Sequence, residues 1–164
     1  MKKLIISIVV LFTSIVFANA QKAYDGCADV KGISCETKCD YAKFVSVFGV
    51  PDEYYKFGEP EDGEEMSETY YFGETYFVFQ NNGELRHFFI RDSRFPVLTN
   101  YLAGGIRVGD KISKLDNFEY GKPVFKEKRK DGTEKYVLWE KSYDPVYIYV
   151  KNGFIKTILY VVIP

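Results

Sequence analysis

This chain has few of the residues that metal binding and nucleic-acid binding require. Histidine occurs once, as His87, and only three cysteines are present. A zinc site takes four ligands, and His87 lies far along the chain from the cysteines, in an apolar segment, so the sequence predicts no bound metal and no cofactor. Lysine and arginine number 22 against 23 aspartates and glutamates, which excludes the basic field that nucleic-acid binding requires.

Catalytic constellations are equally hard to find. A general base needs an activated nucleophile or a carboxylate within reach, and His87, beside Phe88 and Phe89, is typical of a structural histidine in a strand. Gly104-Gly105 has neither the further glycines nor the Lys-Ser/Thr ending of a phosphate-binding loop, and is explained by a turn. We therefore expect a non-enzymatic protein. A small hydrolase that uses His87 with carboxylates is the enzymatic alternative.

The N-terminus has the pattern of a secretory signal peptide. Lys2 and Lys3 precede an apolar run from Leu4 to Phe17, and Ala18-Asn19-Ala20 supplies the small residues that signal peptidase accepts. The run is shorter than the roughly 20 residues of a membrane-spanning helix, which disfavours the alternative of an uncleaved anchor. Cleavage after Ala20 predicts a periplasmic or secreted protein with no transmembrane segment.

Removal of residues 1–20 leaves 144 of the 164 residues, enough for a single domain over 21–164. This mature chain has 20 basic and 23 acidic residues, a formal charge near −3, which gives no reason to expect an anionic membrane as its partner.

Cys27, Cys35 and Cys39 would enter an oxidising compartment, where a disulfide is expected. A bond from Cys27 to either of the others would tie the N-terminal arm to the following helix and close a longer loop than Cys35–Cys39 would, and of the two we favour Cys27–Cys39. The odd count leaves one thiol that is unpaired or that links two chains into a homodimer.

Landmarks recur in the same order at a nearly constant distance, which predicts an internal repeat. Gly49-Val50-Pro51 returns as Gly121-Lys122-Pro123, and Asn82-Gly83 returns as Asn152-Gly153. Each Asn-Gly separates two runs rich in β-branched and aromatic residues, as a hairpin turn does. The sequence thus predicts two copies, over about 36–92 and 106–163.

Each copy is expected to begin with a helix and continue as strands. Thr37 would cap a helix that ends at Phe48, before Gly49, and Asp110 would cap a shorter helix that places Ile112, Leu115 and Phe118 inward. The predicted strands are Glu68–Phe72, Thr75–Gln80, Glu84–Arg91, Lys135–Lys141, Pro145–Lys151 and Phe154–Val162.

The run Gly109-Asp110-Lys111-Ile112-Ser113-Lys114-Leu115, followed by Gly121-Lys122-Pro123, resembles a unit of exported proteins. That unit occurs singly in small outer-membrane lipoproteins and in tandem in the β-lactamase-inhibitor-protein-like superfamily. The resemblance implies an α+β fold in which two tandem helix-plus-antiparallel-sheet repeats form one curved sheet with helices on one face. Its members bind proteins, but no inhibitory loop can be matched here, so no target follows.

Alternation along the strands predicts where a partner would bind. In Val146–Val150 the aliphatic side chains share one face, and Tyr147 and Tyr149 share the other. The offset of 70 between the Asn-Gly turns places Phe77 and Phe79 in equivalent positions, and Trp139 is a further candidate anchor. These five residues form either an exposed protein-binding platform, with a partner in the cell envelope or outside the cell, or part of a thick core. An exposed platform would also suit carbohydrate binding by ring stacking, or self-association of a structural domain.

Overall fold

The computed structural model describes residues 27–58, 67–139 and 144–162, so the predicted signal peptide lies outside the described part. Within these ranges one α-helix, one 3-10 helix and eight strands are present, and the strands form one antiparallel sheet in the order β1-β2-β3-β4-β8-β7-β6-β5. The α+β class with an antiparallel sheet therefore agrees with the expectation. No helix among the described residues is long and apolar enough to span a membrane.

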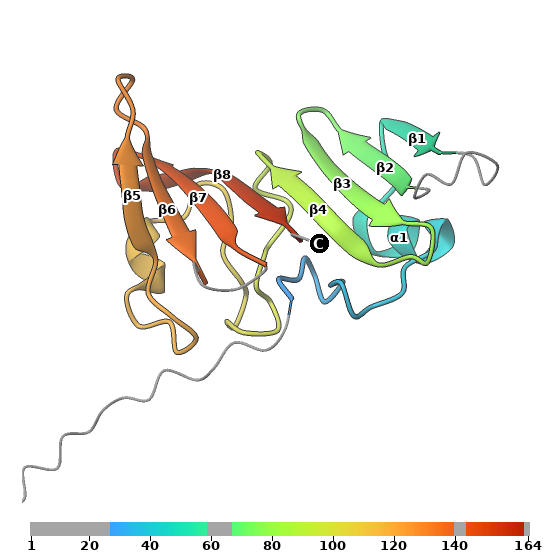
Figure 1. Cartoon of the computed structure of the whole chain (residues 1–164), viewed down its shortest axis with the longest axis horizontal. Helices are drawn as coiled ribbons and strands as arrows, with labels where there is room; N and C mark the ends of the chain where they lie inside the picture. Colours follow the sequence, from blue (N-terminus) through green and yellow to red (C-terminus); the bar gives the residue numbers. More distant parts are fainter. Residues whose placement is uncertain (1–26, 59–66, 140–143, 163–164) are drawn as a thin grey trace, which may run out of the picture.

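The sheet consists of two four-stranded meanders that meet at β4 and β8 (Figure 1). The first contains β1 (Glu53–Phe57), β2 (Ser67–Phe72), β3 (Thr75–Gln80) and β4 (Leu85–Ile90). The second contains β5 (Val124–Lys128), β6 (Glu134–Leu138), β7 (Val146–Lys151) and β8 (Phe154–Val161). The edge strands β1 and β5, which the sequence did not predict, occupy corresponding places at the two ends of the strand order.

Helix α1 (Tyr41–Phe48) begins three residues later than predicted, because Asp40 is its cap in place of Thr37. The Asp40 carboxylate accepts the backbone N–H of Lys43 at 2.8 Å, which satisfies one of the unpaired donors of the first turn. Thr37 lies in the preceding turn, where its hydroxyl is 3.3 Å from that of Ser34. The helix ends as expected at Phe48, before Gly49, which adopts a positive φ of 90°.

The second predicted helix is reduced to the 3-10 turn η1 (Ile112–Leu115), and the expected Asp110 cap is wrong. The Asp110 carboxylate instead accepts the backbone N–H of Arg107 and contacts the ammonium of Lys114. The backbone N–H of Ile112 is bonded to the carbonyl of Gly153 at 3.0 Å. Because this donor is already used by the β7–β8 turn, the segment needs no side-chain cap.

The core lies between the sheet and the segments packed on one of its faces. In Figure 1, α1 lies behind β2 and β3, and η1 lies behind the second meander. The ring of Phe44 is at the centre of the aromatic cluster on the α1 side, 4.0 Å from that of Tyr70 between centroids and 5.8 Å from those of Phe77 and Phe79. On the η1 side, Leu115 of η1 is fully buried and Phe118, which follows it, is nearly so.

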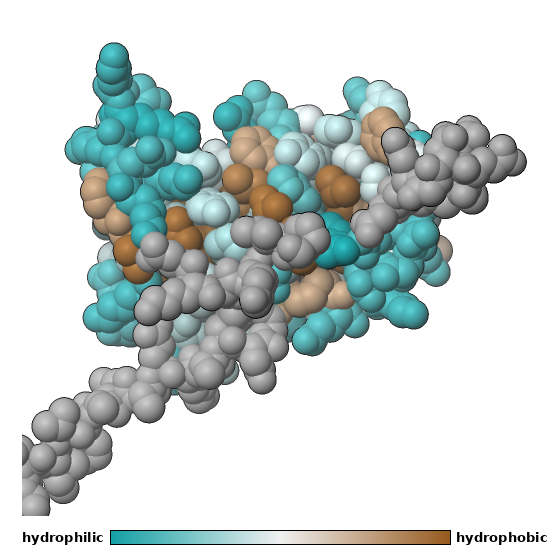
Figure 2. All heavy atoms as spheres, viewed as in Figure 1, coloured by the Kyte–Doolittle hydropathy of each residue, from teal (hydrophilic) through white to brown (hydrophobic). Residues whose placement is uncertain are grey.

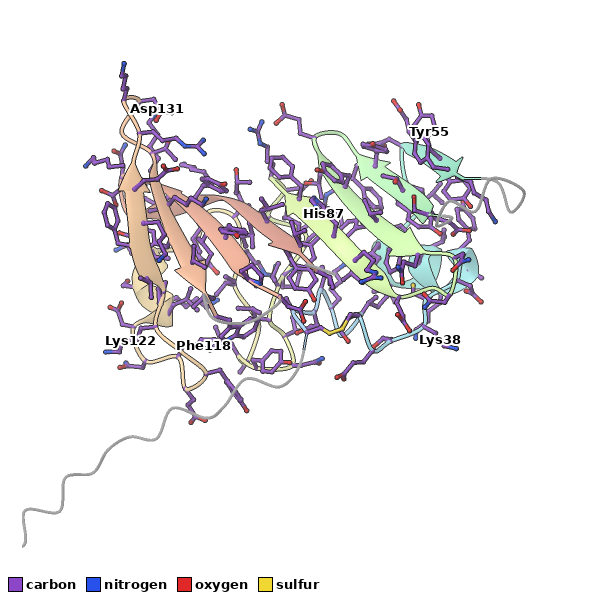
Figure 3. All side chains as sticks on the ribbon, viewed as in Figure 1. Lys38, Tyr55, His87, Phe118, Lys122 and Asp131 are labelled. Atoms are coloured by element: carbon purple, nitrogen blue, oxygen red, sulfur yellow. A yellow bond between two sulfur atoms is a disulfide. The ribbon has the colours of Figure 1, made fainter. Side chains whose placement is uncertain are left out.

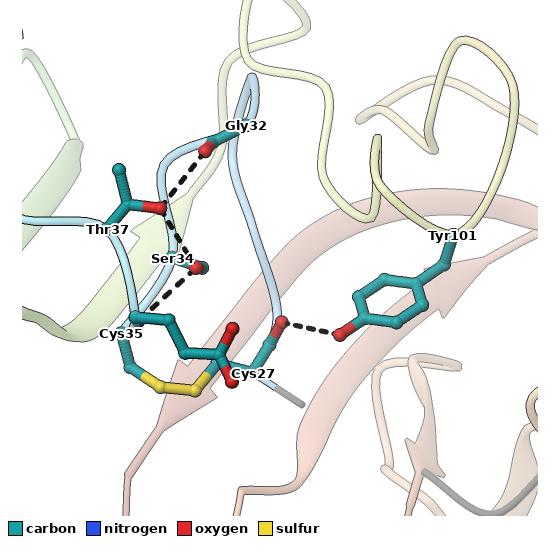
Figure 4. Close-up of a disulfide and its surroundings, with 7 residues drawn as sticks. Cys27, Gly32, Ser34, Cys35, Thr37 and Tyr101 are labelled. Atoms are coloured by element: carbon teal, nitrogen blue, oxygen red, sulfur yellow. Dashed lines mark hydrogen bonds between the residues drawn. A yellow bond between two sulfur atoms is a disulfide. The ribbon is translucent and has the colours of Figure 1, made fainter. Parts of the chain in front are cut away.

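The disulfide joins Cys27 to Cys35, so the predicted Cys27–Cys39 pairing is wrong (Figure 4). Cys35 lies in the turn that brings the chain back beside Cys27. Cys39 stands at the start of the helix, where its backbone N–H donates to the carbonyl of Gly83 at 2.9 Å. The Cys39 thiol is buried, and desolvation raises its pKa to about 11, which makes it unsuitable for linking two chains.

A buried carboxylate organises the same region. Asp29 is inaccessible to solvent and accepts the backbone N–H groups of Gly32 and Asn100, both at 2.9 Å. It also accepts the hydroxyl of Thr99. These bonds tie the N-terminal arm to residues 97–102 across about 70 positions of the chain, which is why local sequence patterns did not reveal them.

Candidate functional site

The two faces of the sheet differ in what covers them. We call open face the side opposite to α1 and η1, and its members follow from the strand register. Val137 on this face is buried, and the other aromatic and aliphatic side chains of its central strands are half-buried: Tyr71, Tyr76, Val78, His87, Phe89, Tyr147, Tyr149, Leu159 and Val161. Figure 2 shows this face, with hydrophobic side chains gathered over the middle of the sheet and hydrophilic ones around them.

A continuous row of rings crosses the first meander on the open face. Tyr55, on the edge strand β1, has its ring centroid 5.8 Å from that of Tyr71, which lies 5.6 Å from that of Tyr76. Tyr76 then contacts Phe89 at 5.5 Å. Register places Leu159 of β8 beside Phe89 and Tyr147 of β7 beside Leu159, so apolar side chains continue into the second meander.

Cations lie over the rings at the border of this row. The guanidinium of Arg91 is 5.2 Å from the ring centroid of Phe89, that of Arg129 is 4.9 Å from Tyr149, and the ammonium of Lys135 is 4.5 Å from Tyr147. Such contacts stabilise a cation on an aromatic face without removing it from solvent. The open face thus combines aromatic area with cations, two of which also contact glutamates, Arg91 with Glu74 at 2.8 Å and Arg129 with Glu127 at 3.6 Å.

A hollow of about 270 Å³ opens on the second meander and is lined by Lys126, Glu127, Lys135, Val137, Pro145 and Tyr147. Lys126 is the extra residue of a bulge in β5, since Phe125 pairs with Tyr136 and Glu127 with Lys135. The bulge therefore brings two consecutive side chains of β5 to the same hollow.

His87 lies within the ring row in the middle of the open face (Figure 3). Its Nε2 atom is 3.1 Å from the hydroxyl of Tyr76, and the two rings are nearly parallel, with 8° between their planes. Burial lowers the pKa of His87, so the imidazole is neutral at pH 7. Its one polar side-chain contact within the described residues is a tyrosine hydroxyl, an arrangement that orders two rings and does not by itself activate a nucleophile.

The histidine gives a prediction for stability against pH. The unfolded chain takes up a proton near the ordinary pKa of 6.5, whereas the folded chain resists protonation until a lower pH. Stability is therefore complete above pH 6.5 and is lost as the pH falls below it. We expect the urea midpoint to drop more between about pH 7.5 and 5.0 in the wild type than in His87→Phe, which keeps a ring but cannot titrate. Equal drops would contradict this, because only the carboxylates common to both proteins would then be titrating.

Three of the five predicted partner-binding residues do not reach the open face. Phe77 and Phe79 are 0 % and 1 % exposed and pack against α1, so the prediction that they face outward is wrong. The offset of 70 was misleading because the β3–β4 loop has four residues, 81–84, whereas the β7–β8 turn has two. One of the two additional residues lies before the Asn-Gly pair and the other after it. The strands before the turns are therefore related by 71 residues, and this shift by one residue exchanges the two faces.

Trp139 is also buried, at 9 % exposure. Strand β6 ends one residue earlier, and Trp139 adopts a positive φ of 58°, which breaks the alternation that would have placed it beside Val137. Its indole N–H donates to the carbonyl of Tyr120 at 2.8 Å, and its ring contacts Tyr101 and Phe118. It is a core residue of the η1 side.

Tyr147 and Tyr149 lie on the open face as their alternation predicted, each half-buried. The residues that sequence reasoning missed are Tyr71, Tyr76 and Phe89, which carry the ring row through the first meander. An offset of 71 between β3 and β7 would have found Tyr76 as the counterpart of Tyr147.

Among the described residues, no three side chains of the His, Cys, Asp and Glu types gather in a way that could hold a metal ion. The arrangement can instead bury a complementary surface through its rings and hold acidic groups through its cations. Comparison with known proteins identified no matching family model, no similar curated protein and no similar solved structure.

Proposed function

We propose that the mature chain is a non-enzymatic, exported binding protein that holds a protein partner against the open face of its sheet. The observation that carries this proposal is the row of rings from the exposed Tyr55 through the half-buried Tyr71 and Tyr76 to Phe89, continued by Leu159 and Tyr147. A sheet that only needs a core uses apolar side chains on one face. This sheet carries them on both.

The composition of the face favours a protein as the partner. Tyrosine and arginine are enriched at the energetic centres of protein interfaces, because rings bury a large area at a low entropic cost and guanidinium groups bind carboxylates. The rings here are half-buried, which holds them in place before a partner arrives. Rigid anchors of this kind reduce the entropy lost on binding.

Carbohydrate binding has less support from the geometry. A sugar stacks on the free face of a ring, but the planes of Tyr55 and Tyr71 are nearly perpendicular, at 86°. Arg129 and Lys135 already lie over the rings of Tyr149 and Tyr147. A partner with side chains can insert between tilted rings and pair with these cations.

Each meander contains an equivalent backbone hydrogen bond. This correspondence supports the proposed duplication and, with it, the resemblance to the inhibitor-like superfamily. In the first, the backbone N–H of Cys39 donates to the carbonyl of Gly83 at 2.9 Å. In the second, that of Ile112 donates to the carbonyl of Gly153 at 3.0 Å. In each case the segment that starts the helical turn is tied to the Asn-Gly turn between the last two strands of its meander.

The proposal is tested by photo-crosslinking at defined positions. A benzophenone amino acid is introduced at Tyr147 or Tyr76, and the mature protein is irradiated with the envelope and extracellular fractions of the organism that encodes it. We expect one discrete protein adduct from both positions. The same amino acid at Tyr41, an exposed tyrosine on the α1 side, serves as the control and should give no such adduct.

Tyr147→Ala combined with Tyr149→Ala should weaken binding of the captured partner by about 10- to 100-fold, as expected for the loss of two interface anchors. Tyr41→Ala should leave the affinity unchanged. The open face is not the binding site if Tyr41 and Tyr147 give equal adducts, or if neither open-face position gives an adduct. The same holds if the double variant binds the partner with unchanged affinity.

A further inference from the structure

The exposed apolar side chains of this protein are concentrated at the two ends of the sheet. Eight large hydrophobic side chains of the described residues are exposed, and five of these lie on the edge strands: Tyr54, Tyr55, Phe57, Val124 and Phe125. All five residues of β1 and all five of β5 are exposed. Phe57 and Phe125 are each about half exposed, at 52 % and 51 %.

Edge strands are usually protected from pairing with another chain. Short length, charged side chains, proline and bulges are the common means. Both edge strands are five residues long and carry charged side chains, and β5 also has a bulge at Lys126. Strand β1 has neither a bulge in its pairing with β2 nor a proline within it, so its protection is the weaker of the two. Within the described residues no strand pairs with the outer side of β1 or of β5, so the question is which strand fits there.

The direction of the strands allows β5 of one copy to lie beside β1 of another. Every neighbouring pair in the eight-stranded order is antiparallel, so β5 runs opposite to β1. A second copy displaced along the sheet therefore places its β5 antiparallel to β1, with both open faces on the same side.

The register follows from which side chains share a face. Tyr55 and Phe57 lie on the open face with Thr69 and Ser67, and Val124 and Glu127 lie on it with Val137 and Lys135. Face-to-face matching then pairs Phe57 with Val124, Tyr55 with Glu127, Lys56 with Phe125, and Tyr54 with Lys128. This pairing skips the extra residue Lys126, as the pairing of β5 with β6 does, so both ends of β5 match the regular strand β1.

This register is complementary in chemistry. It places two apolar side chains together, a lysine beside a phenylalanine, a tyrosine beside a lysine, and Glu53 beside Arg129. In the single molecule the Arg129 guanidinium lies over Tyr149 and 3.6 Å from Glu127, so the exposed Arg129 side chain must turn toward the edge to pair with Glu53. A shift by two residues in one direction opposes Glu53 to Glu127, and in the other direction it opposes Lys56 to Lys128. Like charges directly opposite are destabilising, so the charges select one register among those that keep the faces matched.

We propose that this protein self-associates head to tail, with β1 of one copy pairing antiparallel with β5 of the next, so that the sheet continues from molecule to molecule. The interface is heterologous, because two different edges meet, and it leaves a free β1 and a free β5 at the ends of every assembly that does not close into a ring. Such an assembly repeats the open face along one side. The inference goes beyond the proposed function and does not depend on it.

The first test is the size of the purified mature protein as a function of its concentration, measured by sedimentation velocity. A head-to-tail interface gives a series of species that grows beyond a dimer as the concentration rises. A single species of monomer size at all concentrations up to about 1 mM, the range of weak association, would overturn the proposal.

Charge reversal distinguishes this interface from any symmetric one. Glu53→Arg sets an arginine against Arg129 of the next copy, and Arg129→Glu sets a glutamate against Glu53, so each single variant should weaken self-association by about tenfold. The double variant restores an opposite-charge pair and should assemble as the wild type does. An equimolar mixture of the two single variants recovers complementary edges between unlike copies, so dimers of one variant with the other should form in it.

The controls are Glu36→Arg and Lys38→Glu, reversals at two exposed positions before α1, away from both edge strands. They should assemble as the wild type does, and near-ultraviolet circular dichroism verifies that every variant is folded. If Arg129→Glu has no effect while Glu53→Arg does, the contact is a symmetric β1–β1 pair and the proposal fails. It also fails if the controls weaken assembly as much as the edge variants, or if the mixture forms no such dimers.

Discussion

Phe44→Ala is expected to lower the free energy of unfolding by about 3–5 kcal/mol, the range found when a buried phenylalanine is truncated. The Phe44 side chain is inaccessible to solvent and touches rings from α1, β2 and β3. Alanine would leave a void among rings that are held by their own strands and cannot close over it. The lost dispersion contacts and the cavity add to the lost transfer free energy.

Tyr41→Ala is the matched control, since it removes a ring from the same helix three residues earlier. Tyr41 is 45 % exposed and contacts Tyr54 and Tyr70 only along one side, so we expect a loss of less than about 1 kcal/mol. Urea unfolding followed by circular dichroism measures both variants, with equal slopes confirming that the denatured states are comparable. Similar losses for the two variants would mean that Phe44 is not the centre of this cluster.

The strands next to the Asn-Gly turns were the most predictable part of the fold. Strands β3, β4, β7 and β8 lie where the sequence placed them, because β-branched and aromatic residues alternate there and a turn limits each run. Strands β1 and β5 were missed for a physical reason. Both strands are exposed on each face, so burial imposes no alternation of polar and apolar residues on them. The run Glu53-Tyr54-Tyr55-Lys56-Phe57 therefore resembles a polar loop that contains aromatic residues.

The face of the sheet was predictable in the second meander but not in the first. Tyr147 and Tyr149 alternate with aliphatic residues, which identifies the covered side directly. In β3 both faces carry aromatic residues, so the choice between Tyr76 and Phe77 depended on the offset to β7. One extra loop residue before Asn82 was enough to reverse that choice, since a shift of one residue exchanges the two faces of a strand.

Contacts between distant segments could not be predicted. Asp29 binds residues about 70 positions away, and Cys39 is held by the β3–β4 loop, which leaves Cys35 as the partner of Cys27. Sequence limited the disulfide to two choices. The path of the chain decided between them. It depends on the backbone hydrogen bond from Cys39 to Gly83, which cannot be predicted from a pattern of side chains.

Gly105→Ala is expected to cost about 3 kcal/mol or more, whereas the neighbouring Gly104→Ala should cost about 1 kcal/mol. Both glycines have a positive φ, +59° at Gly105 and +74° at Gly104, so alanine is strained at either position. They differ in the space around them. A Cβ at Gly104 meets no atom within 4 Å, but one at Gly105 lies 2.5 Å from the carbonyl oxygen of Val97.

The Val97 carbonyl cannot move aside easily, because it accepts the backbone N–H of Ile106 at 2.8 Å while the Val97 N–H donates to the Ile106 carbonyl at 2.9 Å. Relief of the clash would therefore break this pair of hydrogen bonds and displace the loop that Asp29 holds from the other side. The difference between the two alanine variants, measured by urea unfolding, isolates the steric effect from the shared backbone strain. Equal losses would show that the loop yields to the methyl group, and that residues 97–106 are not the fixed link between the two meanders that their hydrogen bonds indicate.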